Sequence, residues 1–258
     1  MYTFALSSIT ESQPLFDAYL ATLTGVNDDF WEGHILKSKV YRIIFRDETI
    51  GLCGVCDNEN LTFFHIRHNL LRHAQPALSA ALETLNPQYS YAPTNDEPLL
   101  SLCMDRHAKI GMQAYFFTYC DDGAAAVRPP EYPRELLAVA APGDEADILD
   151  SEGVAENIAL GKYYVMRKNG VFLGQGFFNR LTLAPGAASI GMSVHPDFRR
   201  RGVGRSVIMH MAAICRERGV TPYCGCWYYN HSSKATLESA GFVTRTRLLK
   251  IWLAGDKN

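Results

Sequence analysis

The sequence predicts an α+β protein with mixed sheets, arranged as two similar lobes in tandem. Two observations predict it. Short apolar stretches typical of strands alternate with single amphipathic helices along the chain. The hairpins outlined by residues 41–51 and 164–174 also have the same spacing between a tyrosine and a glycine, which indicates a duplicated unit. Residues 121–133 are rich in Gly, Ala and Pro and predict a linker between lobes 1–120 and 134–258.

The elements expected in the first lobe follow from apolar periodicity. They are a helix at 13–23, strands at 41–45, 50–56 and 61–66, a helix at 76–85, and a short strand ahead of Asn95. The elements expected in the second lobe include more strands than helices. They are a strand at 135–140, a helical patch at 144–160, strands at 163–168, 171–179 and 189–194, a helix at 202–218, a strand at 223–229, a helix at 232–240 and a strand at 244–253. The helix at 202–218 is the clearest, because an apolar residue recurs at helical spacing from Val203 to Ile214 and Gly219 would end it.

Composition narrows the class of protein. The chain has 258 residues, of which 47% are hydrophobic and 20% charged, as in a globular protein of one or two domains. The net charge of −2 gives no overall field for nucleic acid or an anionic membrane, so neither is expected as a partner. The sequence shows neither an export signal nor a run of the roughly 18 to 20 apolar residues that spans a bilayer. We therefore expect a soluble, cytoplasmic protein.

The seven cysteines raise the question of disulfides or zinc. An odd number in a chain with no export signal argues against a disulfide framework. Two pairs, Cys53 with Cys56 and Cys224 with Cys226, have close spacing but lie in apolar, strand-like runs, whereas zinc ligands usually lie on turns. The sequence therefore predicts buried thiols and no metal site.

One segment combines two glycines with four arginines at the start of a helix. It reads Val194-His-Pro-Asp-Phe-Arg-Arg-Arg-Gly-Val-Gly-Arg205. Glycine lets the backbone turn sharply and approach a ligand, and a helix start supplies free N–H groups and the positive end of the helix dipole. Arginine adds bidentate donors for phosphate oxygens. The segment predicts a diphosphate site, and a solvated arginine cluster is the alternative. The residues of this predicted site are Arg199, Arg200, Arg201, Gly202, Val203, Gly204 and Arg205.

A second motif, Asn230-His-Ser-Ser-Lys-Ala-Thr-Leu-Glu-Ser-Ala-Gly-Phe242, follows the next strand. With both motifs, residues 134–253 resemble the GCN5-related N-acetyltransferase (GNAT) superfamily. Residues 199–204 are similar to its Q/R-x-x-G-x-G/A signature, and residues 230–242 are similar to its N-x-x-A/S-x-x-L-x-x-x-G-F signature. The resemblance implies the acyl-CoA N-acyltransferase fold, with acetyl-CoA as co-substrate.

The resemblance also implies where that co-substrate lies. The backbone of Met192, Ser193 and Val194 would hydrogen-bond the pantetheine arm, in a splay between the strands that precede the two motifs. The loop 199–204 would hold the diphosphate. The side chain of Asn230 would hold the cofactor near its thiol end, with Ser233 alongside.

The first lobe resembles a degenerate copy of the same fold. When Ile66 is aligned with Val194, residues 71–76 correspond to 199–204. Ala74 then replaces a glycine, and Pro76 has no N–H to offer a phosphate. Proline still starts a helix well, so the fold can persist without the anion site. Only the second lobe is expected to bind acyl-CoA.

The acid and base that many family members use are missing. Glu238 stands where a tyrosine would protonate the departing thiolate, and Gly225 and Ala188 stand where a glutamate base would lie. Glu238 is therefore the candidate catalytic residue. Other candidate proton acceptors are Tyr228, Tyr229, His195, His231 and water.

These observations predict an N-acetyltransferase that moves an acetyl group from acetyl-CoA to a primary amine by direct attack in a ternary complex. The acceptor is expected to be a small molecule, and a homodimer is one assembly that the sequence leaves open. The alternative is a CoA-binding or sensing module without catalysis, since the usual acid and base are absent. A zinc- or nucleic-acid-binding protein is a third alternative, which neither the charge nor the cysteine placement favours.

Overall fold

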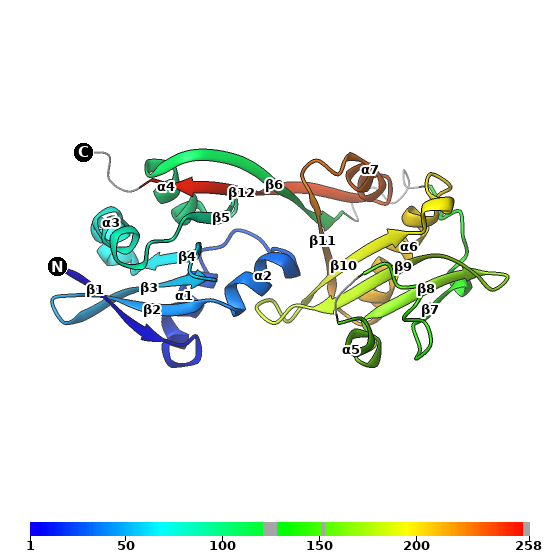
Figure 1. Cartoon of the computed structure of the whole chain (residues 1–258), viewed down its shortest axis with the longest axis horizontal. Coiled ribbons are helices and arrows are strands. Elements are labelled where there is room, and N and C mark those ends of the chain that lie inside the picture. The colour runs from blue at the N-terminus through cyan, green and yellow to red at the C-terminus, as the bar shows by residue number, and fades with distance from the viewer. Residues whose placement is uncertain (121–127, 151–152, 255–258) are drawn as a thin grey trace. The chain divides into compact units, whose positions relative to one another are not determined.

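The structure, a computed structural model, describes residues 1–120, 128–150 and 153–254. It divides into two compact units, with Met1–Ala114 and Thr246–Asn258 in unit 1 and Tyr115–Arg245 in unit 2 (Figure 1). Each unit has a mixed sheet with helices packed on it, which confirms the predicted α+β class. Two long strands, β6 (His107–Tyr119) and β12 (Phe242–Leu253), contribute residues to both units.

The sheet of unit 1 begins at the N-terminus. Its strands are β1 (Tyr2–Ser7), β2 (Lys39–Phe45), β3 (Glu48–Cys56), β4 (Asn60–Ile66) and β5 (Tyr89–Pro93). Strands β1 to β4 are antiparallel, and β5 runs parallel to β4. Residues 248–252 of β12 then pair antiparallel with β5. The helices packed on these strands are α1 (Gln13–Leu20), α2 (Asp29–Leu36), α3 (Ala74–Leu85) and α4 (Glu97–Asp105).

Both faces of β4 are buried, because successive side chains of a strand point to opposite faces. Phe63 contacts α1 on one face, where its ring lies 5.5 Å from that of Phe16 and 5.1 Å from that of Tyr19. Phe64 belongs to the core formed with α3 and α4 on the other face. A strand covered on both faces explains the continuous apolar run that the sequence shows here.

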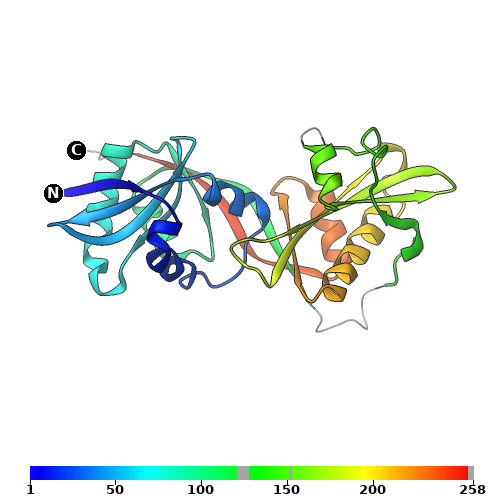
Figure 2. The same cartoon turned by 90° about the horizontal axis from the view of Figure 1, so that it is seen from below.

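Unit 2 repeats this plan. Its strands are β7 (Leu137–Val139), β8 (Tyr163–Lys168), β9 (Val171–Arg180), β10 (Ala187–Val194) and β11 (Thr221–Trp227). Strands β7 to β10 are antiparallel, β11 runs parallel to β10, and β6 and β12 follow β11 in the sheet. The helices are α5 (Val154–Ala159), α6 (Val203–Glu217) and α7 (His231–Ser239). Helix α6 packs along β9 and β10 with α7 beside it (Figure 2).

The core of unit 2 is organised around α6. The predicted apolar stripe is confirmed, since Val203, Val207, Met211 and Ile214 are each no more than 3% exposed. Residues of β6 enter the same core through Tyr115 and Phe117. The N-terminal part of the chain therefore supplies side chains that unit 2 needs for its packing.

The predicted repeat is confirmed at the two hairpins. Gly51 on β3 and Gly174 on β9 are the matched glycines of the two outlines. A Cβ on Gly51 would lie 2.1 Å from the carbonyl oxygen of His65, and one on Gly174 would lie 2.6 Å from that of Ser193. Both positions therefore need glycine for the same reason, a close approach of the next strand's backbone.

The elements differ from expectation in a few places. Only α5 is helical within 144–160, since the backbone turns at Gly143 and Gly153, both with positive φ, while residues 151–152 lie outside the described residues. Elements β1, α2, α4 and β6 had no counterpart in the sequence-based expectation. The compact units also differ from lobes 1–120 and 134–258, because β6 and β12 are long enough to extend from one unit into the other. Part of the expected linker 121–133, residues 121–127, lies outside the described residues.

Buried carboxyl groups make the stability of unit 1 depend on pH. Asp96 accepts hydrogen bonds from the Tyr19 hydroxyl (2.9 Å) and the Leu99 N–H (3.1 Å), and burial raises its pKa to about 6. Burial, and then the charge of Asp29, raise the pKa of Asp28 to about 7. A raised carboxyl pKa means that the folded state holds the proton more tightly, so stability is greatest below pH 4 and falls as the pH rises towards 6 or 7.

We expect the substitution Asp96→Asn to remove the part of this dependence that Asp96 causes. The wild-type free energy of unfolding should lose about 2 kcal/mol between pH 4 and pH 6.5 through this group, and the variant should not. Urea denaturation of both proteins across this range measures the difference. A difference between wild type and variant that does not change with pH would contradict the assignment.

Candidate functional site

Strands β10 and β11 separate along their length. They pair in parallel only at Ala187–Thr221, Ala188–Pro222 and Ser189–Tyr223. Beyond this point β10 continues to Val194, still paired with β9, while β11 continues to Trp227. The burial of β10 changes at the same place, from buried through Ile190 to half-buried from Gly191 onward. The structure therefore contains the splay that the resemblance implied.

The splay leaves backbone groups of β10 facing the edge from which β11 has departed. The His195 N–H donates to the Leu173 carbonyl (3.0 Å) on the side of β9. Because N–H groups alternate between the two edges of a strand, those of Val194 and Met192 face the opposite edge. They are placed to hydrogen-bond an extended ligand.

The loop after β10 enters α6 through left-handed backbone. A short 3₁₀ turn at Pro196–Phe198 is capped by His195, whose Nδ1 accepts from the Asp197 N–H (3.4 Å). Arg200 (φ 59°) and Gly202 (φ 81°) then reverse the chain into α6. No side chain caps α6, and the first N–H groups of a helix have no partner within it. Residues 202–205 thus combine a left-handed turn with a helix start that no side chain caps.

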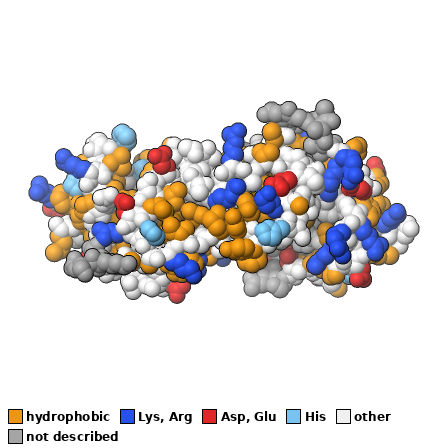
Figure 3. Space-filling model, turned by 90° about the horizontal axis from the view of Figure 1, so that it is seen from above, with side chains coloured by type: hydrophobic (Ala, Val, Ile, Leu, Met, Phe, Trp, Pro, Cys, Tyr) orange, Lys and Arg blue, Asp and Glu red, His pale blue; other side chains and the backbone are white. Residues whose placement is uncertain are grey.

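Three of the four arginines are exposed beside this helix start. Arg199, Arg200 and Arg201 are all exposed, and Arg199 Nε donates to the Val194 carbonyl (3.4 Å) at the mouth of the splay. The guanidinium of Arg201 lies 5.7 Å from the centre of the Phe198 ring. The space-filling view shows Lys and Arg side chains gathered over unit 2 (Figure 3).

The fourth arginine has a different place. Arg205 is 7% exposed and donates to the carbonyls of Ser239 (3.1 Å) and Pro129 (2.8 Å) and to the carboxylate of Glu131 (3.1 Å). Glu131, from the segment expected to be linker, also lies against Gly202, where a Cβ would come within 2.6 Å of its carboxyl group. Sequence reasoning missed Glu131, because 74 residues separate it from Arg205. Through these contacts Arg205 fixes the segment 128–132 against α6.

The second motif forms the start of α7. Asn230 is exposed, and its Oδ1 accepts from the Ser233 N–H (3.0 Å), so both residues lie at the helix cap. Glu238, the predicted catalytic residue, is exposed on α7 and paired with Lys234 one turn earlier. Its catalytic role stays a prediction. Of the two adjacent tyrosines, Tyr228 stacks on Tyr115 with ring centres 4.7 Å apart, and Tyr229 is exposed.

Unit 1 has no such helix start. A 3₁₀ helix, His68–His73, leads directly into α3, and the Ala74 N–H donates to the Leu71 carbonyl. Within the described chain, no residue between Ile66 and Pro76 has a positive φ. In unit 1, therefore, the Ala74 N–H already donates within the chain. The first N–H groups of α6 in unit 2 have no partner within their own helix.

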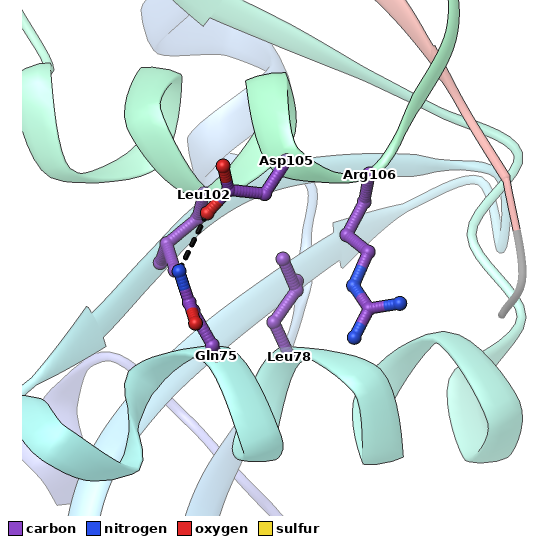
Figure 4. A pocket seen from close by; sticks show the side chains of 5 residues that line it. All are labelled: Gln75, Leu78, Leu102, Asp105 and Arg106. Carbon is purple, nitrogen blue, oxygen red and sulfur yellow. Dashed lines mark hydrogen bonds between the residues drawn. The ribbon is translucent and has the colours of Figure 1, made fainter.

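Each unit contains a small cavity. That of unit 1, about 240 Å³, is lined by residues of α3 and α4 and by Arg106, and the Gln75 amide donates to Asp105 (2.7 Å) across it (Figure 4). That of unit 2, about 270 Å³, lies beside Gly191, Met192 and Ser193 of β10. Its polar wall, Asp150, Tyr163 and Gln175, was not singled out from the sequence, because Asp150 fell in the expected helical patch and the other two on strands.

Two further expectations concern metal ions and membranes. Among the residues that the structure describes, no group of three or more His, Cys, Asp or Glu side chains could hold a metal ion. None of the seven cysteines forms a disulfide, and five of them are buried. Over the same ranges, no helix combines the length and the apolar character needed to cross a bilayer.

The fold and the loop define an acyl-CoA N-acyltransferase architecture, and comparisons with known proteins agree. Residues 8–120 match the family described as an acetyltransferase (GNAT) domain, and residues 131–242 match the acetyltransferase (GNAT) family. The chain therefore belongs to the GNAT acetyltransferases and carries two GNAT domains in tandem. No curated protein matches the sequence.

Solved structures show the same fold. A GNAT-family acetyltransferase from Colwellia psychrerythraea is 16% identical, with a TM-score of 0.84 over 98% of this chain and 99% of that one. A tandem GNAT protein from the clavulanic acid biosynthesis pathway is 14% identical, with a TM-score of 0.64 over all of both chains. A GCN5-related N-acetyltransferase from Sphaerobacter thermophilus is 14% identical, with a TM-score of 0.63 over 100% of this chain and 98% of that one.

Proposed function

We propose that the chain is an N-acetyltransferase that binds acetyl-CoA in unit 2 and acetylates the amine of a small molecule. The observation that carries this proposal is the separation of β10 from β11 beside the uncapped start of α6. An extended chain with a negatively charged end fits this arrangement, because free backbone donors line one part and helix-start donors the other.

Each part of acetyl-CoA has residues suited to it. The N–H groups of Met192 and Val194 would hold the pantetheine arm as a neighbouring strand would. The loop 199–204 would hold the diphosphate through backbone N–H groups and the exposed arginines. Arg205 would support the loop from inside, through its contacts with Glu131 and Ser239.

Amide formation from a thioester needs little covalent catalysis by the protein. Bound acetyl-CoA supplies an activated thioester. The residues of unit 2 have to hold an amine within reach of it, donate a hydrogen bond to its carbonyl oxygen and accept a proton. A backbone N–H near Val194 is our candidate for the donor, and Glu238 remains the candidate for proton transfer near the sulfur.

We propose that unit 1 binds no acetyl-CoA. Its helix α3 starts from a 3₁₀ helix without a glycine turn, and Pro76 lacks an N–H. Strands β4 and β5 also pair in parallel, at Asn60–Tyr89, but the Asn60 side chain accepts from the Tyr91 N–H (3.0 Å). A side chain of the protein therefore already accepts a hydrogen bond from backbone that faces the gap between these strands.

Replacing Arg199 and Arg201 together by alanine tests the diphosphate assignment. We expect the double variant to bind acetyl-CoA at least about tenfold more weakly, because each charge-assisted hydrogen bond contributes about 1.5 kcal/mol or more. Isothermal titration calorimetry measures this. Arg72→Ala, an exposed arginine at the aligned place in unit 1, is the control and should keep wild-type affinity. Equal affinities for all three proteins would contradict the assignment.

An assay of CoA release with a panel of amines separates this proposal from a CoA-sensing module. Acetyl-CoA binding without turnover across a broad panel would favour the sensor. Amine-dependent release of CoA would support the enzyme.

A further inference from the structure

The cavity of unit 2 lies on the stretch of β10 that the splay leaves free of β11. Gly191, Met192 and Ser193 form one wall, and they begin two residues after Ser189, the last residue of β10 that pairs with β11. Gly191 contributes no side chain to that wall. At about 270 Å³ the cavity is smaller than the pockets of drug-sized ligands. It therefore suits a small molecule placed next to the expected thioester.

A carboxylate is held at this cavity by a buried amide. The Gln175 amide donates to Asp150 (2.9 Å), and its own oxygen accepts from the Leu149 N–H (2.7 Å). Gln175 is only 2% exposed, so its orientation is fixed. Tyr163 lines the same cavity beside Asp150. Gln175 of strand β9 thus positions the carboxylate of Asp150, which lies outside the helices and strands.

The phenol remains a donor throughout the working pH range. Burial raises the pKa of Tyr163 well above its usual value, and the hydrogen bond to Asp150 and the charge of that carboxylate raise it further. A carboxylate can accept about four hydrogen bonds. Asp150 is itself exposed, so its oxygens can receive a donor from a ligand as well.

The charge and shape of the cavity select the ligand. Asp150 is the one charged side chain among the described residues that line it, and Phe177 supplies apolar surface. A carboxylate without a neighbouring cation attracts a positive group, and the apolar surface favours an apolar body beside that group.

We propose that this cavity is the acceptor site, that it takes a small primary amine with a single positive charge and an apolar body, and that Asp150 binds the ammonium group and accepts its proton. The proposal rests on the proposed acetyltransferase function. The ammonium nitrogen gives one proton to Asp150, which passes it to solvent. The freed amine forms a C–N bond with the thioester carbonyl carbon while the C–S bond breaks. The second proton leaves the nitrogen for the CoA sulfur, so the products are the acetamide, CoA thiol and one proton.

The test uses 2-phenylethylamine as the probe and 2-phenylethanol as its uncharged counterpart. With wild type, acetyl-CoA and the amine should release CoA and yield the acetamide, whereas the alcohol should not react. Asp150→Asn should lower kcat/KM for the amine about 100-fold or more, and it should remove the saturation-transfer NMR signal of the amine measured with CoA bound. Glu156→Gln removes an exposed carboxylate of the same region that does not line the cavity, and it should behave as wild type.

Calorimetry of acetyl-CoA binding separates the two proposals. Wild type that binds no acetyl-CoA would overturn the proposed function. Wild type that binds acetyl-CoA but neither binds nor acetylates the amine would overturn only the acceptor site. An Asp150→Asn variant that keeps its melting temperature and its turnover, while Glu238→Gln loses turnover, would also overturn the role given to Asp150.

Discussion

Replacing Gly202 by aspartate is expected to abolish measurable acetyl-CoA binding, a loss of at least about 100-fold in affinity. The new carboxylate would stand at the start of α6, where the diphosphate is proposed to lie, and would repel it. The backbone there has φ 81°, and a Cβ would come within 2.6 Å of the Glu131 carboxyl group. The left-handed conformation adds a cost of roughly 1–2 kcal/mol, so the loop would also be displaced.

The control for this variant is Gly219→Asp, at the opposite end of α6. Gly219 also has a positive φ, of 66°, but a Cβ there would meet nothing within 4 Å. Both variants therefore carry similar backbone strain and the same charge, and only Gly202→Asp should lose binding. Calorimetry measures affinity, and circular dichroism confirms that both remain folded. Wild-type affinity in Gly202→Asp would refute the diphosphate assignment.

Ending the chain at Arg245 is expected to unfold unit 1 and leave unit 2 folded. The deletion removes the part of β12 that pairs with β5, including Leu248 and Ile251, both 0% exposed. Losing a single buried Leu or Ile side chain costs about 2–5 kcal/mol. Two such losses, together with the strand hydrogen bonds, approach the whole stability of about 5–15 kcal/mol that a domain has.

Hydrogen exchange with mass spectrometry can assign this effect to a unit. Peptides from β3 and β4 should lose protection, and peptides from β8 to β10 should keep it. A chain that ends at Ala254 is the control, because it keeps all of β12. Loss of protection in β8 to β10, with β3 and β4 unchanged, would show that residues 246–253 stabilise the other unit.

The parts of the fold that were predicted from the sequence are those set by local pattern. The hairpins β2–β3 and β8–β9 and the helix α6 follow from apolar periodicity, and each occurs within a few residues of its expected range. The glycine loop could also be predicted from the sequence, because it needs only a left-handed residue at Gly202 and hydrogen-bond donors around it.

The parts that were not predicted depend on contacts between distant residues. The apolar pattern of a strand does not show which other strand pairs with it. The contribution of β6 and β12 to both units could therefore not be predicted from the sequence. Arg205 has the same side chain as its exposed neighbours, and only its contact with Glu131 shows that it is internal. Asp150 is held by Gln175, whose strand was predicted correctly from periodicity, but periodicity cannot show which distant residue such a side chain contacts.

The division of β12 between the units has a consequence for biosynthesis. Residues 248–252 complete the sheet of unit 1, yet they are synthesised only after unit 2. Domains usually fold in order from the N-terminus as they are made. Here the nascent unit 1 lacks one strand of its sheet until the whole of unit 2 has been translated.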